Sequence, residues 1–222
     1  MSRMNTTPTH ATLAGLTLVR HPLVQHKLTM LRDRRTSRKL FAELVSELAM
    51  LVAYEAMRDL PLKETPIETP LERSTGQRIS DERITLVPVL RAGLGMVEGI
   101  LKLVPSLVVA HVGFYRDHDN LQPVAYYSNL PSDAAERVFL LLDPMLATGG
   151  TAVSAISLLK DAGARHIQFL CLVAAPEGVR RVRDVHPDVS TFAVALDREL
   201  DERGYILPGL GDAGDRLFGT TP

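Results

Sequence analysis

The chain has 222 residues, enough for one large domain with a substantial hydrophobic core. Its composition, 45% hydrophobic and 23% charged, is that of a soluble globular protein. The formal net charge of −1 gives no basic field for nucleic acid, and a single cysteine excludes an internal disulfide framework. The sequence contains neither a recognisable signal peptide nor an apolar stretch of membrane-spanning length, so we expect a cytoplasmic protein that contacts neither nucleic acid nor a membrane.

The first third of the chain favours helix. Residues 1–12 are polar and are expected to be flexible. From Pro22 to Arg58 the apolar residues recur at helical spacing, and Thr36 and Ser37 are candidate helix caps within this stretch. Residues 61–80 carry three prolines and many charges, which indicates extended or edge structure on the periphery of the domain.

The centre of the chain has the rhythm of an α/β protein. Short apolar runs alternate with helical stretches, and the runs cover residues 84–90, 107–115, 138–143, 167–174 and 191–196. Near-continuous apolar strands interleaved with helices predict a central, mostly parallel sheet with helices on both faces, formed by residues 1–222 as a single domain. Residues 117–136 are long and polar, and we expect them to form a projecting arm or hairpin. Cys171 lies in an apolar run and is expected to be a buried, inert thiol.

The segment PGLGDAG, residues 208–214, contains the pattern G-x-G-x-x-G. In dinucleotide-binding proteins this pattern joins a strand to a helix early in a βαβ unit, with a second strand to follow. Only eight residues follow Gly214. A dinucleotide fingerprint is therefore excluded, and the glycines need another explanation.

The stretch LLLDPMLATGGT, residues 140–151, predicts an anion site. Asp143 closes an apolar strand, where its carboxylate can accept hydrogen bonds from sugar hydroxyls. Gly149 and Gly150 allow the backbone to approach a phosphate, while Thr148 and Thr151 add hydroxyl donors and Thr151 is a candidate cap for the next helix. An ordinary turn followed by a helix cap is the alternative, and no P-loop pattern occurs in the chain.

These residues resemble the substrate loop of the type I phosphoribosyltransferases, and DPMLATGGT is the form found in uracil phosphoribosyltransferases. Most of the superfamily has two adjacent acidic residues, whereas Pro144 follows Asp143 here. The resemblance extends from about His21 to Thr220. Its other motifs are HPLVQHKL (21–28), VPVLRAGLGM (87–96), LVAAPEG (172–178), HPDV (186–189) and GYILPGLGDAGDRLFGT (204–220).

The resemblance implies a type I phosphoribosyltransferase fold and an activity that joins uracil to 5-phospho-α-D-ribose 1-diphosphate (PRPP), giving UMP and diphosphate in pyrimidine salvage. The implied PRPP-binding residues are Arg91, Arg116, Asp143, Pro144, Met145, Leu146, Ala147, Thr148, Gly149, Gly150, Thr151 and Asp212. Asp143 and Arg116 are the implied catalytic residues. Taken alone, each arginine could equally be a solvated surface side chain.

The glycine-rich segment then becomes the uracil pocket by resemblance. Ile206, Gly211, Asp212 and Ala213 are the implied uracil-binding residues, within a small hood formed by residues 204–220. Backbone groups at fixed spacing can distinguish uracil from similar bases, and glycine permits the close approach. Tyr205 is a candidate wall of this pocket, with a core tyrosine as the alternative.

The resemblance also implies Mg²⁺ as cofactor, held mainly by the substrate diphosphate rather than by protein side chains. A homo-oligomer, dimer or higher, is expected, with the apolar helical segment 40–57 as a possible interface, and GTP is a possible activator. The alternatives that remain are a phosphoribosyltransferase for another base and a regulatory relative that binds RNA. The second alternative requires a basic face, for which Arg32–Lys39 is the nearest candidate.

Overall fold

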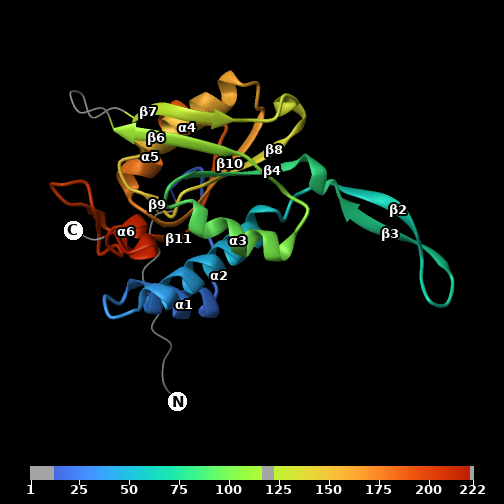
Figure 1. Ribbon diagram of the computed structural model, residues 1–222, viewed down its shortest axis with the longest axis horizontal. Coiled ribbons are helices and arrows are strands. Elements are labelled where there is room, and N and C mark those ends of the chain that lie inside the picture. The colour runs from blue at the N-terminus through green and yellow to red at the C-terminus, as the bar shows by residue number, and fades with distance from the viewer. Residues whose placement is uncertain (1–12, 117–122, 221–222) are drawn as a thin grey trace, which may run out of the picture.

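The computed structural model describes residues 13–116 and 123–220. Its centre is a nine-stranded sheet in the order β1-β11-β10-β8-β4-β6-β7, with β5 paired to β4 and β9 paired to β10 (Figure 1). All of these pairings are parallel except that of β6 with β7. The strands of the sheet are β1 (Leu16–Leu18), β4 (Ile84–Leu90), β5 (Val108–Val109), β6 (His111–Arg116), β7 (Pro123–Asn129), β8 (Val138–Leu142), β9 (Met145–Leu146), β10 (His166–Ala174) and β11 (Ser190–Leu196). The predicted mostly parallel sheet is confirmed.

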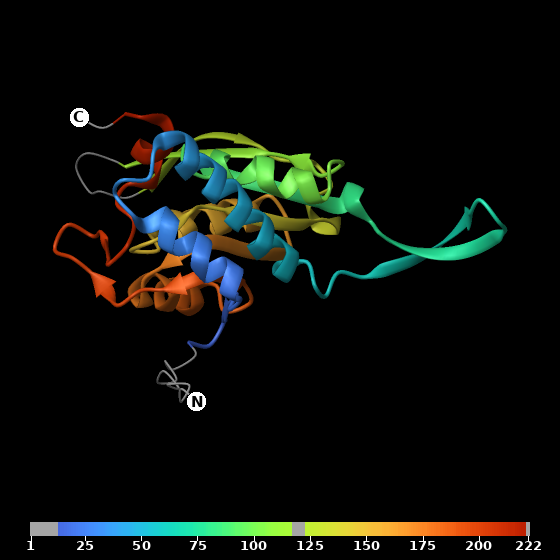
Figure 2. The same ribbon diagram turned by 90° about the horizontal axis from the view of Figure 1, so that it is seen from below.

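Helices cover both faces of this sheet, as Figures 1 and 2 show. They are α1 (Pro22–Arg32), α2 (Arg38–Ala56), α3 (Leu94–Leu103), α4 (Gly150–Asp161), α5 (Pro176–Val185) and α6 (Ala213–Phe218), with short 3-10 turns at Asp81–Arg83 and Ala134–Glu136. One apolar cluster joins α1, α2, α3 and α6 to one face, and a second joins α4 and α5 to the other.

Strand β8 shows why both faces are apolar. Phe139 and Leu141 belong to the cluster under α4 and α5, whereas Leu140 and Leu142 belong to the cluster under α2 and α3. Side chains of a strand alternate between faces, so a strand covered on both sides must be apolar at every position. Cys171 on β10 is fully buried, and burial raises the pKa of its thiol, which confirms the prediction of an inert cysteine.

The helical pattern predicted from Pro22 to Arg58 forms two helices, and of the two candidate caps within it Ser37 is confirmed. Helix α1 ends at Arg32 and α2 begins at Arg38, with Ser37 as its N-cap; the Ser37 hydroxyl accepts a hydrogen bond of 3.3 Å from the Leu40 N–H. The Thr36 hydroxyl instead donates to the Met30 carbonyl at 2.5 Å, closing the end of α1. The break turns α2 so that its apolar face packs on the sheet.

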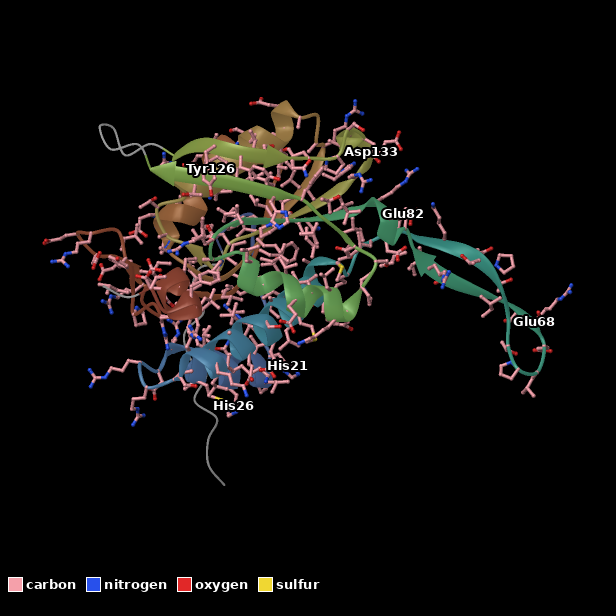
Figure 3. All side chains as sticks on the ribbon, in the orientation of Figure 1. His21, His26, Glu68, Glu82, Tyr126 and Asp133 are labelled. Carbon is pink, nitrogen blue, oxygen red and sulfur yellow. The ribbon has the colours of Figure 1, made fainter. Side chains whose placement is uncertain are left out.

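A two-stranded hairpin extends away from the body of the molecule. Strands β2 (Leu62–Glu68) and β3 (Arg73–Ile79) pair in antiparallel register and lead through the turn at Asp81–Arg83 into the amino end of β4. Figure 3 places Glu68 near the far end of this hairpin and Glu82 at its base. The prediction of peripheral extended structure for residues 61–80 is confirmed.

Of the projecting arm or hairpin predicted at residues 117–136, the described part is the second strand of a hairpin, because β7 pairs with β6 in antiparallel register. Residues 123–129 form β7, the edge strand of the main sheet, and Tyr126 of this strand covers Gly113 of β6, where an added Cβ would lie 2.5 Å from the tyrosine ring (Figure 3). Residues 117–122, and residues 1–12 predicted to be flexible, lie outside the described ranges. The polar segments 61–80 and 117–136 both favour an exposed hairpin. The first, β2–β3, pairs with no other described strand, whereas the second contains β7, whose partner β6 also pairs with β4 of the main sheet.

The C-terminal segment folds back over α1 and α2 at the carboxyl edge of the sheet. A small ribbon, β12 (Glu199–Leu200) with β13 (Ile206–Leu207), is followed by α6. Arg216 of α6 lies over the ring of Phe41 at 4.1 Å and donates to the Leu31 and Asp33 carbonyl oxygens at 2.9 and 2.8 Å. In the described part of the chain, no helix combines the length and apolar character needed to cross a lipid bilayer.

Candidate active site

A pocket of about 420 Å³ opens at the carboxyl edge of the sheet, where ligands bind in open α/β folds. Two segments far apart in the sequence form it, and Ala92 completes it. The lining residues are Ala92, Asp143, Met145–Ala152, Arg203–Ile206 and Gly211–Gly214. The loop predicted to bind phosphate and the segment predicted to bind uracil therefore meet in one cavity.

The loop between β8 and α4 is shaped for an anion. Gly149 has a φ of 77°, a left-handed conformation that glycine adopts without steric cost, and it is the N-cap of α4. The prediction that Thr151 caps this helix is wrong, because α4 begins at Gly150 with no side-chain cap. The Thr148 hydroxyl accepts only a long hydrogen bond of 3.5 Å from the Gly150 N–H. The first turn of α4 contains no acidic residue, so its free N–H groups favour an anion in the pocket.

Asp143 lies where β8 ends, and its carboxylate faces the pocket. Its N–H donates to the Leu170 carbonyl oxygen at 3.2 Å, which fixes the backbone against β10. Removal from water raises the pKa of Asp143 to about 7, and the neighbouring Asp212 carboxylate adds to the rise. The Met145 N–H, 3.3 Å from Oδ1, opposes this by lowering the pKa. A carboxyl group with a pKa this far from its usual value in a pocket is typical of a functional site.

Pro144 does not belong to the pocket lining. It is buried, and its carbonyl oxygen accepts hydrogen bonds from the Leu172 and Val173 N–H groups at 3.0 and 3.1 Å. These two hydrogen bonds to β10 fix the backbone of the loop at Pro144. Pro144 thus positions the neighbouring residues, and its predicted direct contact with PRPP has no support in this geometry.

The two predicted arginines lie at the carboxyl ends of adjacent parallel strands, as their positions in the sequence suggest. Arg91 comes directly after β4, and its guanidinium lies 3.9 Å from the Asp215 carboxylate and 5.7 Å from the centre of the Phe218 ring, so it points toward α6. Its side chain is 60% exposed and does not line the pocket, although the next residue, Ala92, does. Arg116 ends β6, where its backbone pairs with Pro123; its side chain lies outside the described part of the structure.

The predicted uracil segment forms the opposite wall. Ile206 is 4% exposed and presents an apolar surface, while Gly211 has a φ of 80° and leaves the backbone open to the cavity. Asp212 is the N-cap of α6, its Oδ1 accepting a hydrogen bond of 2.9 Å from the Asp215 N–H, and Ala213 begins the helix. Tyr205 is 46% exposed and lines the pocket, so the alternative of a core tyrosine is wrong.

The structure adds pocket residues that the sequence did not single out. They are Ala92, Ala152, Arg203, Gly204 and Gly214. Gly204 has a φ of 81° and closes a turn, because its N–H donates to the Asp201 carbonyl oxygen at 2.9 Å. This turn brings Arg203 to the pocket wall. Asp201 and Gly204 are residue types that favour turns, so the sequence did contain a signal for this turn.

A family model described as uracil phosphoribosyltransferase matches residues 18–220. The chain belongs to the uracil phosphoribosyltransferase family. A uracil phosphoribosyltransferase of Listeria welshimeri is 57% identical over 208 residues, covering 94% of this chain and 100% of the relative. One of Halalkalibacterium halodurans is 58% identical over 200 residues, covering 90% of this chain and 96% of the relative.

Solved structures place this uracil phosphoribosyltransferase family member in the expected fold. The AQ2163 protein from Aquifex aeolicus aligns with a TM-score of 0.88 at 35% identity, covering 93% of this chain and 99% of that protein. An adenine phosphoribosyl transferase from Trypanosoma brucei aligns with a TM-score of 0.58 at 11% identity, over 90% of each chain. The second match concerns the fold alone. The type I phosphoribosyltransferase fold expected from the sequence is confirmed.

Proposed function

We propose that this enzyme transfers the phosphoribosyl group of PRPP to uracil, giving UMP and diphosphate. The observation that carries the proposal is the single pocket formed by the loop 143–152 and the segment 203–214. The first segment offers N–H groups at a helix N-terminus and one carboxylate, which suit a sugar phosphate. The second offers a wall in which Gly211 leaves the backbone open beside the apolar surface of Ile206, which suits a small planar base. The close relatives named for this activity support the same assignment.

Asp143 has the central role in the proposed mechanism. Its carboxylate accepts hydrogen bonds from the ribose hydroxyls and stabilises positive charge as the bond from the anomeric carbon to diphosphate breaks. Because the pKa of Asp143 is about 7, the substrate must draw it into the charged form. Hydroxyl donors in reach of the carboxylate do this, since hydrogen bonds favour the ionised group. Positioning of uracil by Ile206 and the Gly211–Ala213 backbone supplies the remaining rate enhancement.

Mg²⁺ is proposed as the cofactor, bound through the diphosphate of the substrate. Asp143 and Asp212 are the acidic side chains of the pocket lining. Burial is the main cause of the raised pKa of Asp143 and the Asp212 carboxylate adds to it, so a divalent cation in the pocket would favour the ionised form of Asp143. The described residues contain no cluster of three or more His, Cys, Asp or Glu side chains placed to hold a metal ion. When bound, Mg²⁺ neutralises the leaving diphosphate. Arg91 and Arg116, at the carboxyl ends of β4 and β6, are proposed to share that task.

The experiment that tests the proposal measures diphosphate release by the purified protein with PRPP and Mg²⁺. Uracil, cytosine, orotate, hypoxanthine and adenine are compared at equal concentration. Turnover with uracil alone is expected, because the backbone of Gly211–Ala213 presents polar groups at fixed spacing to the base. Faster turnover with any other base would overturn the assignment of uracil.

The RNA-binding alternative has no specific observation in its favour. Its basic candidate, Arg32–Lys39, is largely occupied within the protein: Arg32 pairs with Asp197 at 2.6 Å and Arg35 with Asp33 at 2.7 Å. The Arg38 guanidinium donates to the Phe218 carbonyl oxygen at 3.4 Å. Cations that already have partners gain little from a phosphate backbone.

A homo-oligomer is proposed, but through a different surface from the one that the sequence suggested. The apolar face of residues 40–57 is part of the core, with Phe41 and Val52 fully buried, so an interface built on that face is wrong. The β2–β3 hairpin instead exposes Leu62 and Leu71, at 56% and 95%. Sedimentation of the intact chain tests this proposal, since shortening the hairpin should lower the molecular mass of the particle.

Two further properties are proposed from family membership alone. GTP is proposed as an activator, which a titration of GTP into the uracil assay tests directly. A cytoplasmic location is proposed as well, and cell fractionation tests it.

A further inference from the structure

The loop that faces the pocket carries no cation of its own. Residues 147–151 read Ala-Thr-Gly-Gly-Thr, so the loop offers N–H and hydroxyl groups but no positive side chain. A sugar phosphate has close to two negative charges at neutral pH, and helix N-termini contribute only a partial charge. Any full positive charge beside this loop must come from another element.

Helix α5 brings one arginine to the back of the loop. Gly178 packs so closely that an added Cβ would lie 2.4 Å from the Ala147 carbonyl oxygen. Arg181 is one turn later on the same helix face, and its Nη1 donates to the Thr148 carbonyl oxygen at 3.5 Å. A Cβ built on Gly150 would lie 3.4 Å from that same nitrogen. The guanidinium therefore lies against the start of α4 from behind the loop, and Arg181 is not itself among the residues that line the pocket.

A second arginine approaches the loop from the other side of the pocket. Arg203 lines the cavity from the turn between β12 and β13, and the next residue lies against the loop, since a Cβ built on Gly204 would be 3.5 Å from Thr148 Cγ2. Within the described part of the chain, neither Arg181 nor Arg203 has an acidic partner within salt-bridge distance. Two arginines near the carboxyl ends of the strands are paired with carboxylates instead, Arg32 with Asp197 and Arg198 with Glu199.

The order of the strands separates the two phosphate groups of the substrate. The loop follows β8 and pairs through β9 with β10, on one side of Asp143, whereas Arg91 and Arg116 follow β4 and β6 on the other side. A sugar held by Asp143 would place its diphosphate toward Arg91 and Arg116. Its 5′-phosphate would then lie in the loop, between Arg181 and Arg203.

We propose that Arg181 and Arg203 are substrate-binding residues that hold the 5′-phosphate of PRPP from two sides. The inference rests on the proposed function, and it names a pair of cations that the sequence pattern of the loop does not contain. Both side chains are exposed, so their removal should leave folding intact. Arg180 is the matched control, because it is an exposed arginine on the same helix that points about 100° away from the loop face.

The test is calorimetric titration of the intact protein, which requires no turnover and so is independent of the base. Ribose 5-phosphate probes the loop, and pyrophosphate with Mg²⁺ probes the opposite side. We expect Arg181→Ala and Arg203→Ala each to weaken ribose 5-phosphate binding about tenfold, the loss typical of one charge-assisted hydrogen bond, while pyrophosphate binding stays within twofold. Arg181→Lys should recover part of the loss, and raising the salt concentration should reduce the difference from the native protein.

Steady-state kinetics of the same variants gives a second readout. The KM for PRPP should rise about tenfold in each, with kcat and the KM for uracil within twofold, because the arginines bind ground state and transition state equally. Unchanged ribose 5-phosphate binding in both variants, as in Arg180→Ala, would overturn the proposal. Weaker pyrophosphate binding instead would overturn the placement of the 5′-phosphate, and an effect in one variant alone would remove the other arginine from the site. If the native protein does not turn over uracil, the proposed function is refuted, whereas the binding measurements on the two arginines keep their meaning.

Discussion

Replacing Arg32 by alanine should uncouple the base-binding segment from the body of the protein. The Arg32 guanidinium donates from Nη1 and Nη2 to the two Asp197 carboxylate oxygens at 2.7 and 2.6 Å, and Nη1 also donates to the Gly209 carbonyl oxygen at 2.7 Å. The Gly209 N–H returns a bond of 2.8 Å to Asp197. Helix α1, the end of β11 and the glycine-rich segment are thus joined at one carboxylate.

The cost of this change follows from the burial of the pair. The Asp197 side chain is 4% exposed and that of Arg32 is 22% exposed, so the variant retains a nearly buried carboxylate with one backbone N–H as partner. Breaking a buried pair by removing one partner costs about 3 to 5 kcal/mol, and the partial exposure of Arg32 favours the lower end, about 3 kcal/mol. The KM for uracil should rise as well, because Gly209 loses one of its two anchors.

Urea unfolding of the Arg32→Ala variant measures the loss in free energy of unfolding. An unchanged dependence of this free energy on urea concentration checks that unfolding stays two-state. Arg58→Ala is the control: Arg58 pairs with Glu55 at 2.6 Å, but the two side chains are 62% and 26% exposed, so a loss below about 0.5 kcal/mol is expected. Equal losses in the two variants would refute the reasoning, since burial would then not decide the outcome. An unchanged KM for uracil would refute the anchoring role.

Three further outcomes are expected. Asp143→Asn should lower kcat about a hundredfold. Burial raises the pKa of Asp143 from 3.8 to about 7, so the native protein loses stability as pH rises through this range. The variant should therefore be more stable than the native protein at pH 8, by up to about 4 kcal/mol, and equally stable or less stable at pH 4. Near-normal turnover, or an advantage that grows as pH falls, would contradict this. Gly178→Ala should destabilise the protein by about 2 kcal/mol and raise the KM for PRPP, because the added Cβ would meet two backbone oxygens, of Ala147 and Leu146, at 2.4 and 2.9 Å; unchanged kinetics would show that the loop moves freely. Chelation of Mg²⁺ should abolish turnover and leave the melting temperature unchanged, and a lower melting temperature would place the metal on protein side chains.

The phosphate loop could be predicted because its signals are local. A buried strand, a terminal carboxylate, two glycines and a helix stand in order over residues 140–151, and each constrains its neighbour. The cap of α4 was mispredicted for the same local reason, since threonine is a good cap but the left-handed conformation at Gly149 fills that position.

The peripheral segments show what the sequence leaves open. Residues 61–80 and 117–136 are both polar, and no local feature states that the second contains an edge strand while the first extends away from the sheet. Both segments pair locally, β2 with β3 and β7 with β6; what differs is that β6 also pairs with β4 of the main sheet, and β4 lies farther back in the chain. Arg181 and Arg203 were missed for a similar reason, because their significance depends on distances to Thr148 and Gly150 across three elements.

The β2–β3 hairpin extends from the amino end of β4 (Figure 1), whereas the pocket opens at the carboxyl ends of the strands. This separation gives the two ends of the molecule different evolutionary freedom. Residues near the pocket must satisfy two substrates at once, whereas the tip around Leu71 can accept substitutions or an inserted peptide without disturbing the chemistry. The hairpin tip can therefore vary while the reaction at the other end of the sheet stays the same.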